Sequence, residues 1–452
     1  MSDNPHRTAL NAPRHPGETA LPVGAPGRTA FLHHHVADYL PGAPQIPLWV
    51  VAERDVRGRL RIAAQPVGAE VSCPVPAERG VAGFAAQFAV PVIDLSAPLP
   101  LDPVVIPKPW GRELWFTGVE ARGQSGVRGE GGSLPLPWLL SIVPDEILGN
   151  SRRKLNLLKI LDPLPDPLYG DLYFELHEEK REVYVVTRVD PASWPAGRGA
   201  IRYGFDAGVR AAYPDDQAFR VAYLRVVQAY ERVRRQIERQ EAEWRRAEGW
   251  GPQDPVPAAT LRRWRAALAP ELRRAEVEAR AAMERFTRLL PIGVGDVVQV
   301  PTLLPHALQH GVRTVEFQTP VYERRILSFA QQVLTQDHWD TELAVRQMRL
   351  DPPPQAAMEV VGESPGVTRE RIVAFDDFLV DRWTLQPGAS VALQPQGAYA
   401  LVMAIGGDIR VAGVVLAAEH ALLLPASCAA VGVENGGSEP ALLLVSRPVG
   451  GS

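Results

Sequence analysis

The chain has 452 residues, 46% of them hydrophobic, and a formal net charge of −4. This length accommodates two or three domains, and the hydrophobic content excludes a chain that is disordered overall. The slightly acidic balance argues against nucleic-acid binding, and no apolar run approaches the roughly 20 residues of a membrane-spanning helix. The two cysteines, Cys73 and Cys428, lie far apart, so neither a disulfide framework nor a thiolate zinc site is expected. Since the N-terminus also lacks the apolar core of a signal peptide, we expect a cytoplasmic protein.

The N-terminal part of the chain predicts a tail followed by strands. Residues 1–28 are rich in Pro, Gly, Ala and Arg without periodicity, which predicts a mobile tail. Residues 29–205 contain short apolar runs separated by turn residues, which is typical of strands with tight connections. Three adjacent histidines, His33, His34 and His35, could bind a metal. Because adjacent residues on a strand point to opposite faces, a surface role is the better interpretation.

Residues 206–293 have a different pattern. Apolar residues recur at helical spacing from Phe219 to Ile237 and again from Leu261 to Leu290, and glycines and prolines separate the two runs. This predicts two long helices that interrupt a β protein, with solvated Arg and Glu faces rather than an interaction surface. Strand-like runs return in residues 294–350. A further β set, residues 365–450, has turn residues at short intervals, as in an antiparallel sandwich or barrel.

Carboxylate and imidazole side chains occur in two short segments that are far apart in the sequence. Glu175 and His177 are two residues apart, so on a strand they point to the same side, and Glu182 can return to that face across a short turn. His306 must come from a different strand, which we expect to begin at Gly295. These side chains hold divalent metals such as zinc, and such sites also accept iron or manganese. A four-ligand metal site is therefore predicted. Its alternatives are a solvated charged hairpin for the first segment and a core or turn histidine for His306.

The spacing of these residues is similar to the two motifs of cupin barrels. The first motif places two ligands two residues apart and a glutamate four or five residues further on, matching Glu175, His177 and Glu182. The second motif is a glycine, five residues, a proline, four residues and a histidine, matching Gly295, Pro301 and His306.

Over residues 106–447 the chain resembles the type I phosphomannose isomerases (mannose-6-phosphate isomerases). The resemblance implies a mainly β fold with an α insertion, built from double-stranded β-helix (cupin or jelly-roll) barrels. It implies a metal-binding core cupin, a helical insertion between the third and fourth ligands, and a C-terminal cupin without metal, since Ala430 stands where a ligand histidine would be. The implied metal is one divalent ion, zinc above all, held by Glu175, His177, Glu182 and His306. Glu175 stands where the family has glutamine, which adds a negative charge to the site.

The resemblance also implies catalytic residues and an activity. Lys180 matches the family's lysine two residues before the glutamate ligand, and Arg324 is favoured over Arg325 as the family's arginine. The implied reaction interconverts mannose 6-phosphate and fructose 6-phosphate through an enediol(ate). Arg324 would stabilise the enediolate or the phosphate, and Lys180 would contact phosphate or transfer a proton. Glu316 is a weaker candidate, whose alternative is a buried strand carboxylate paired with an arginine. The alternatives in function are an isomerase of another sugar or sugar phosphate, and a non-catalytic cupin that binds a metal or a sugar.

Overall fold

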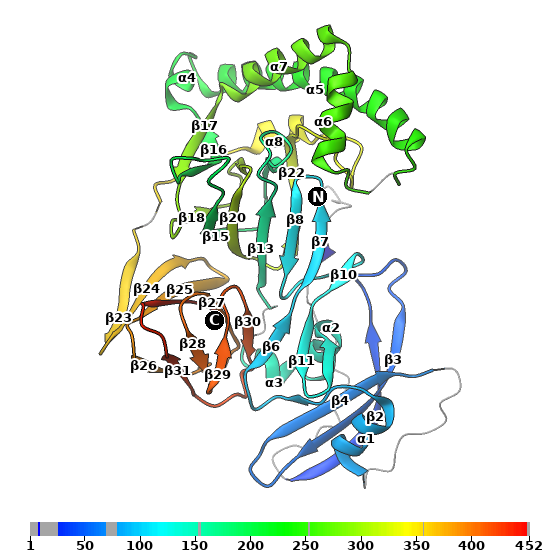
Figure 1. The fold of residues 1–452 in the computed structure, drawn as a ribbon, viewed down its shortest axis with the longest axis vertical. Coiled ribbons are helices and arrows are strands. Elements are labelled where there is room, and N and C mark those ends of the chain that lie inside the picture. The colour runs from blue at the N-terminus through cyan, green and yellow to red at the C-terminus, as the bar shows by residue number, and fades with distance from the viewer. Residues whose placement is uncertain are drawn as a thin grey trace.

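The computed structural model describes residues 8–9, 26–68, 79–151, 155–251, 254–355 and 357–449. The protein is mainly β with antiparallel sheets, as the sequence predicts, and its longer helices gather at one end (Figure 1). The predicted tail and Cys73 fall largely outside the described residues. Within the tail, β1 (Thr8–Ala9) pairs with β21 (Val321–Tyr322). No helix among the described residues has the length and apolar character needed to cross a membrane.

An N-terminal sheet with the order β2-β3-β4-β5 lies at the opposite end from the long helices (Figure 1). Helix α1 (Gly80–Phe88) packs on one face of it, and the other face joins the central core. The strands are β2 (Gly27–Val36), β3 (Gln45–Arg54), β4 (Leu60–Pro66) and β5 (Ile93–Asp94).

The three adjacent histidines lie on β2. His34 is exposed, as predicted, but His35 is buried and its Nε2 lies 3.2 Å from the Tyr39 hydroxyl. His33 Nε2 lies 2.6 Å from the Ser141 hydroxyl of α2 (Leu136–Ile142). The surface interpretation is therefore wrong for His35, because one face of β2 is covered.

Two sheets, of six and five strands, occupy the middle of the molecule (Figure 1). Ten of these strands, all except β22, make up what we call the first unit. One sheet has the order β18-β15-β20-β13-β8-β7, and the other has the order β17-β16-β19-β14-β22, in which β22 (Arg325–Ser328) is an additional strand. The ten strands are β7 (Val104–Lys108), β8 (Gly111–Trp115), β13 (Leu157–Pro163), β14 (Phe174–Leu176), β15 (Glu182–Val189), β16 (Gly199–Phe205), β17 (Thr287–Ile292), β18 (Val297–Val300), β19 (His306–Leu308) and β20 (Val312–Gln318).

The segment before His306 differs from the prediction. A strand starting at Gly295 was expected to end at this histidine, but β18 ends at Val300, and His306 begins the separate strand β19 in the other sheet. In between, Leu303 adopts a left-handed conformation (φ 64°), and its amide donates to the His177 carbonyl at 2.6 Å. This turn moves the chain from one sheet to the other and fixes it beside His177.

Helices α4 (Ala207–Ala211), α5 (Asp216–Ala247), α6 (Ala258–Ala267) and α7 (Pro270–Glu284) lie between β16 and β17, and hence between Glu182 and His306. The second predicted helix is in fact two, α6 and α7. Ala269 is extended (ψ 138°), because a residue before proline is disfavoured in helical conformation, and Pro270 starts a new helix. The predicted end of the second helix is also wrong, since Leu290 lies in β17, which is paired with β16. Helix α5 packs on the first unit through Phe219, whose ring lies 5.3 Å from that of Phe205.

The C-terminal strands form a second unit with the same strand order as the first. Its sheets run β30-β27-β32-β25-β24-β23 and β29-β28-β31-β26. The strands are β23 (Glu359–Ser364), β24 (Val367–Ala374), β25 (Phe378–Leu385), β26 (Ser390–Leu393), β27 (Ala400–Gly406), β28 (Ile409–Val411), β29 (Val414–Leu416), β30 (Ala421–Leu424), β31 (Val431–Asn435) and β32 (Ala441–Pro448).

The remaining elements connect these parts. Strand β6 (Leu99–Asp102) extends the larger sheet of the second unit by pairing with β30. One apolar core is shared by the N-terminal sheet, the second unit and one face of the first, with Val50, Leu158 and Leu401 among its members. The other elements are β9 (Val119–Glu120), β10 (Gly123–Gln124), β11 (Gly126–Gly129), β12 (Gly132–Pro135), α3 (Pro144–Leu148) and α8 (Thr341–Gln347).

Candidate metal centre and the adjoining pocket

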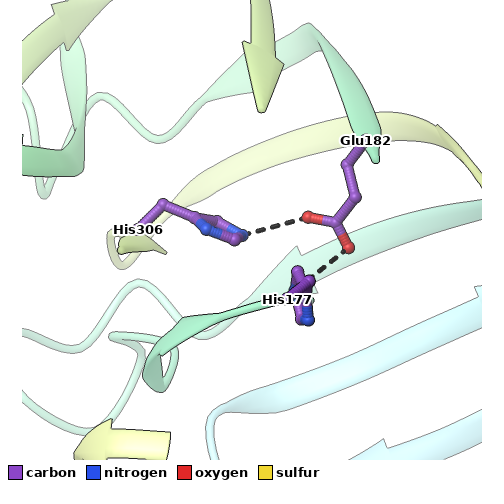
Figure 2. Close-up of side chains that lie close together, drawn as sticks. All are labelled: His177, Glu182 and His306. Carbon is purple, nitrogen blue, oxygen red and sulfur yellow. Dashed lines mark hydrogen bonds and ion pairs between the residues drawn. The ribbon is translucent and has the colours of Figure 1, made fainter. Parts of the chain in front are cut away.

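Three of the predicted metal ligands meet inside the first unit. His177 directly follows β14, Glu182 begins β15 and His306 begins β19, and all three side chains point toward one another (Figure 2). Each residue offers a ligand atom within 4.8 Å of the others, and their exposed fractions are 1–3%. Two strands of one sheet and one of the other thus deliver an acid and two imidazoles to one buried point.

The histidine rings are oriented by the backbone. His177 Nδ1 lies 2.9 Å from the Glu323 carbonyl, and His306 Nδ1 lies 3.0 Å from the Leu304 carbonyl. Since a carbonyl only accepts, each Nδ1 donates its proton to the backbone, and each Nε2 faces Glu182. This is the arrangement by which metal-binding histidines are usually held.

The distances between the ligand atoms suit a cation. Nε2 of His306 lies 3.0 Å from Glu182 Oε2, and Nε2 of His177 lies 3.5 Å from Glu182 Oε1. Two donor atoms, each about 2.0–2.1 Å from a tetrahedral zinc ion, lie roughly 3.3 Å apart. The buried His177 Nε2 has no hydrogen-bond partner among the described residues, as expected for an atom kept for a metal.

The protonation of the centre also favours a cation. Burial by itself would raise the pKa of Glu182, but Lys180, His177 and His306 together hold it well below its usual range. Burial and the nearby Lys180 lower the pKa of His177 well below its usual value. A carboxylate and a neutral imidazole are the forms that ligate metal.

Glu175, the fourth predicted ligand, lies at the edge of this group. It is paired across the sheet with His306, and its Oε1 lies 3.8 Å from His177 Nε2. Its other oxygen, Oε2, lies 3.9 Å from Nη1 of Arg324. Glu175 therefore connects the three-residue group with the pocket that contains Arg324.

The predicted catalytic residues have different surroundings. Lys180 Nζ lies 2.5 Å from Glu182 Oε1, so the lysine is part of the centre. Arg324 packs over the Tyr173 ring at 4.5 Å. Its rival Arg325 donates to Glu178 at 2.8 Å and lies 3.7 Å from Asp340, so its guanidinium is held in structural ion pairs.

Glu316 lies behind Glu182 and is buried. It is paired with a lysine, Lys159 (Nζ to Oε2, 3.3 Å), and not with the arginine that the alternative reading expected. Burial, and then the nearby Glu182, raise its pKa well above its usual value. Glu316 is therefore a buried carboxyl group that connects Lys159 with Glu182.

A pocket of about 300 Å³ adjoins the centre and was not found from the sequence. Three cations and one carboxylate face this space, and the polar part of the lining consists mainly of Lys108, Arg122, Arg324, Asp254, Tyr173 and Tyr322. Burial lowers the pKa of Lys108, and Arg122 and Arg324 act in the same direction. Burial would raise the pKa of Tyr322, but the three cations lower it. This pocket suits an anionic ligand.

Two further charged residues link the pocket to the centre. Glu113 Oε2 accepts from Trp115 Nε1 at 2.5 Å and lies 3.4 Å from Lys108 Nζ and 3.9 Å from Lys159 Nζ. Burial opposes ionisation of Glu113, yet Lys108, Lys159 and Trp115 lower its pKa to about 2.

The one signal that could have identified Lys159 in the sequence is a charge inside the apolar run 157–161. The burial of every residue of β13 confirms that this charge faces a core.

The comparisons with known proteins give a fold. No protein-family model matches the chain, and no curated protein matches it. Among solved structures, the mannose 6-phosphate isomerase from Bacillus subtilis superposes with a TM-score of 0.52 at 15% identity, covering 77% of this chain and 99% of that one. A mutant of the phosphomannose isomerase from Salmonella typhimurium gives 0.53 at 13% identity, covering 78% and 99%. A mannose 6-phosphate isomerase bound with zinc and yttrium gives 0.50 at 13% identity, covering 78% and 100%. The chain therefore shares the fold of these isomerases.

Proposed function

We propose that this protein is a metal-dependent aldose–ketose isomerase of a sugar phosphate, with mannose 6-phosphate and fructose 6-phosphate as its substrate pair. The observation that carries the proposal is the convergence of His177, Glu182 and His306 beside a pocket with three cations. The fold shared with sugar-phosphate isomerases supports it. We further propose that both ten-strand units are cupin-type double-stranded β-helices, since their strand orders are identical.

The residues at the centre fit a divalent metal, and we propose zinc. His177, Glu182 and His306 would hold it, with Glu175 as the fourth ligand through Oε1. When bound, the metal would stabilise the negative charge that develops on a sugar oxygen during isomerisation. The chain itself supplies the oriented imidazoles and the ionised carboxylate described above.

The pocket residues would bind and orient the substrate. Lys108, Arg122 and Arg324 offer charged donors to a phosphate group, and the guanidinium fork of Arg324 also suits an enediolate. Glu175 holds Arg324 at the side of the pocket nearest the metal centre. Since its contact with Glu182 keeps the Lys180 ammonium charged, we assign it hydrogen-bond donation to a sugar oxygen. Glu316 and Lys159 would act indirectly, by fixing Glu182 and Glu113.

The test is elemental analysis of the purified protein, followed by an isomerisation assay on a panel of phosphorylated and free sugars, with and without a chelator. We expect one divalent ion per chain and turnover of mannose 6-phosphate that the chelator removes and added metal restores. His306→Ala should abolish both metal binding and turnover.

The matched control is His310→Ala. His310 is paired with Asp171 at 2.7 Å and stacked on Trp194, so its loss should leave turnover within a few-fold of wild type. Metal-loaded protein without turnover on the whole panel would refute the proposal, and activity on another sugar alone would refute its substrate.

A further inference from the structure

The shared strand order allows the two units to be compared residue by residue. In the first unit, the pairing of β15 with β20 shifts register between Val186 and Arg188. In the second, the pairing of β27 with β32 shifts between Ala404 and Gly406. A register shift marks a bulge and gives a fixed reference point in a sheet. With the two bulges superposed, Glu182 corresponds to Ala400.

The same reference point extends across the sheets. Glu182 is paired with Gln318, and the register of β27 with β32 brings Ala400 opposite Arg447, so Gln318 corresponds to Arg447. Continuing strand by strand gives three further pairs, in which Lys159, Trp115 and Glu113 correspond to Asp381, Arg371 and Arg369. The region next to Glu182 in the first unit thus corresponds to a cluster of three arginines and one aspartate in the second. We call Arg369, Arg371, Asp381 and Arg447 the arginine cluster.

The arginine cluster has more positive than negative charge. Asp381 pairs with Arg371, and its Oδ2 lies 3.5 Å from Arg447 Nη1. The guanidinium of Arg369 lies over the Trp383 ring, 5.7 Å from its centroid. Glu370 is occupied by Arg382, at 2.9 Å. Glu359, across from Arg371 on β23, is exposed.

Several donors of the cluster lack partners. The buried Nε atoms of Arg369 and Arg447 and the indole Nε1 of Trp383 have no hydrogen-bond partner within the described part of the chain. Trp383 is only 2% exposed, so its N–H is shielded from bulk water. Buried donors without acceptors are costly and call for a ligand or water. Burial lowers the pKa of Arg447, and the charges of Arg369 and Arg371 lower it further, whereas Asp381 raises it. A bound anion would relieve the repulsion among the three arginines.

The cluster remains reachable from solvent. The side chains of Arg371 and Arg447 are 28% and 17% exposed, while Asp381 is 7% exposed. Gly362 of β23 lies against Arg369, where a β-carbon would come 2.3 Å from Nη2. The glycine thus leaves room for the guanidinium. Planar guanidinium groups match the oxygens of phosphate and carboxylate.

We propose that the arginine cluster of the second unit is a binding site for a small oxyanion, a phosphate or carboxylate group. The site is distinct from the proposed isomerase centre and does not depend on that function. It occupies the place in its unit that the polar residues beside Glu182 occupy in the first, since the counterpart of Glu182 itself is Ala400.

The experiment is calorimetric titration of the full chain with inorganic phosphate and, in a second arm, with acetate. An Arg324→Gln background weakens the other cationic pocket, so that the remaining binding reports on the arginine cluster. In this background we expect about one anion per chain, with the two arms deciding between phosphate and carboxylate. The double substitution Arg369→Gln and Arg447→Gln should weaken binding more than tenfold. The matched control, Arg112→Gln with Arg128→Gln, removes the same charge from two arginines that are 55% and 61% exposed, and should change affinity less than twofold.

Gly362→Ala provides a second test that keeps every charge. Its methyl group displaces the Arg369 guanidinium, so we expect weaker anion binding with an unchanged melting temperature. This variant decides the matter if the double substitution fails to fold. The proposal is refuted if the Arg324→Gln protein binds neither anion, or if folded Arg369→Gln/Arg447→Gln or Gly362→Ala protein binds as tightly as the control.

Discussion

The contact between Lys180 and Glu182 leads to a test of the metal centre that does not require activity. Both side chains are almost fully buried, and Nζ lies 2.5 Å from Oε1. At an effective dielectric constant of ~20, this separation corresponds to a Coulomb attraction of roughly 6–7 kcal/mol, from which the desolvation of both groups must be subtracted. Removing one partner of a buried pair typically costs about 3–5 kcal/mol, because the other charge stays buried and unpaired. With an unfolding entropy of about 2.1 cal/mol/K per residue, Lys180→Met should therefore lower the melting temperature of the metal-free protein by about 3–5 °C.

The same substitution should cost much less when metal is present. A divalent cation next to Glu182 would replace the lost positive charge, so saturating zinc should restore most of the melting temperature. Lys159→Met is the matched control, because Lys159 contacts Glu316 and Glu113 instead of a proposed ligand. Its loss should be similar with and without zinc. The measurement is thermal unfolding of wild type and both variants, in chelator and in zinc. Equal losses for Lys180→Met in both conditions would show that no cation binds beside Glu182.

Three further predictions concern other residues. Arg324→Gln should lower kcat/KM by roughly a hundredfold, as expected for a group that stabilises developing charge. Arg325→Gln should instead lower the melting temperature and leave KM unchanged. The reverse pattern in steady-state kinetics would exchange the roles of the two arginines. Glu175→Gln should weaken zinc binding about tenfold in a competition titration while turnover with saturating metal is kept or increased, and tighter zinc binding would contradict this. Burial lowers the pKa of His35 to about 4, so the folded protein resists its protonation, and the free energy of unfolding should fall as the pH drops from about 6.5 toward 4. His35→Gln should flatten this part of the profile of stability against pH. An unchanged slope would assign the loss of stability to other groups.

The convergence of His177, Glu182 and His306 could be predicted from the sequence because it rests on spacing. Two ligands that are two residues apart, Glu175 and His177, share a strand face, and a short turn returns Glu182 to it. His306 was placed correctly even though its strand was not, because the turn through Leu303 changes sheets without changing the residue's position in the motif. The mainly β character, with long helices between these segments, was also predictable from periodicity.

The pocket could not be predicted in the same way. Lys108, Arg122 and Tyr322 come from separate loops and strands, and no local pattern relates them. Lys159 and Glu113 are single charges on strands, and their mutual contact depends on the pairing of β13 with β8. Such contacts depend on register, which a single sequence specifies only weakly. The break between α6 and α7 is different, since Pro270 was visible in the sequence and its effect was missed.

The matched bulges of the two units also bear on how such a two-sheet unit can change over time. At corresponding positions, one unit has two glutamates, a glutamine, a lysine and a tryptophan, while the other has an alanine, three arginines and an aspartate. The strand order is nevertheless the same. The stability of each unit must therefore come mainly from its apolar layers, such as the one containing Val402 and Leu443. The polar positions of each unit are then free to exchange one chemistry for another without loss of the fold, so a new activity could arise there by a few substitutions in an already stable frame.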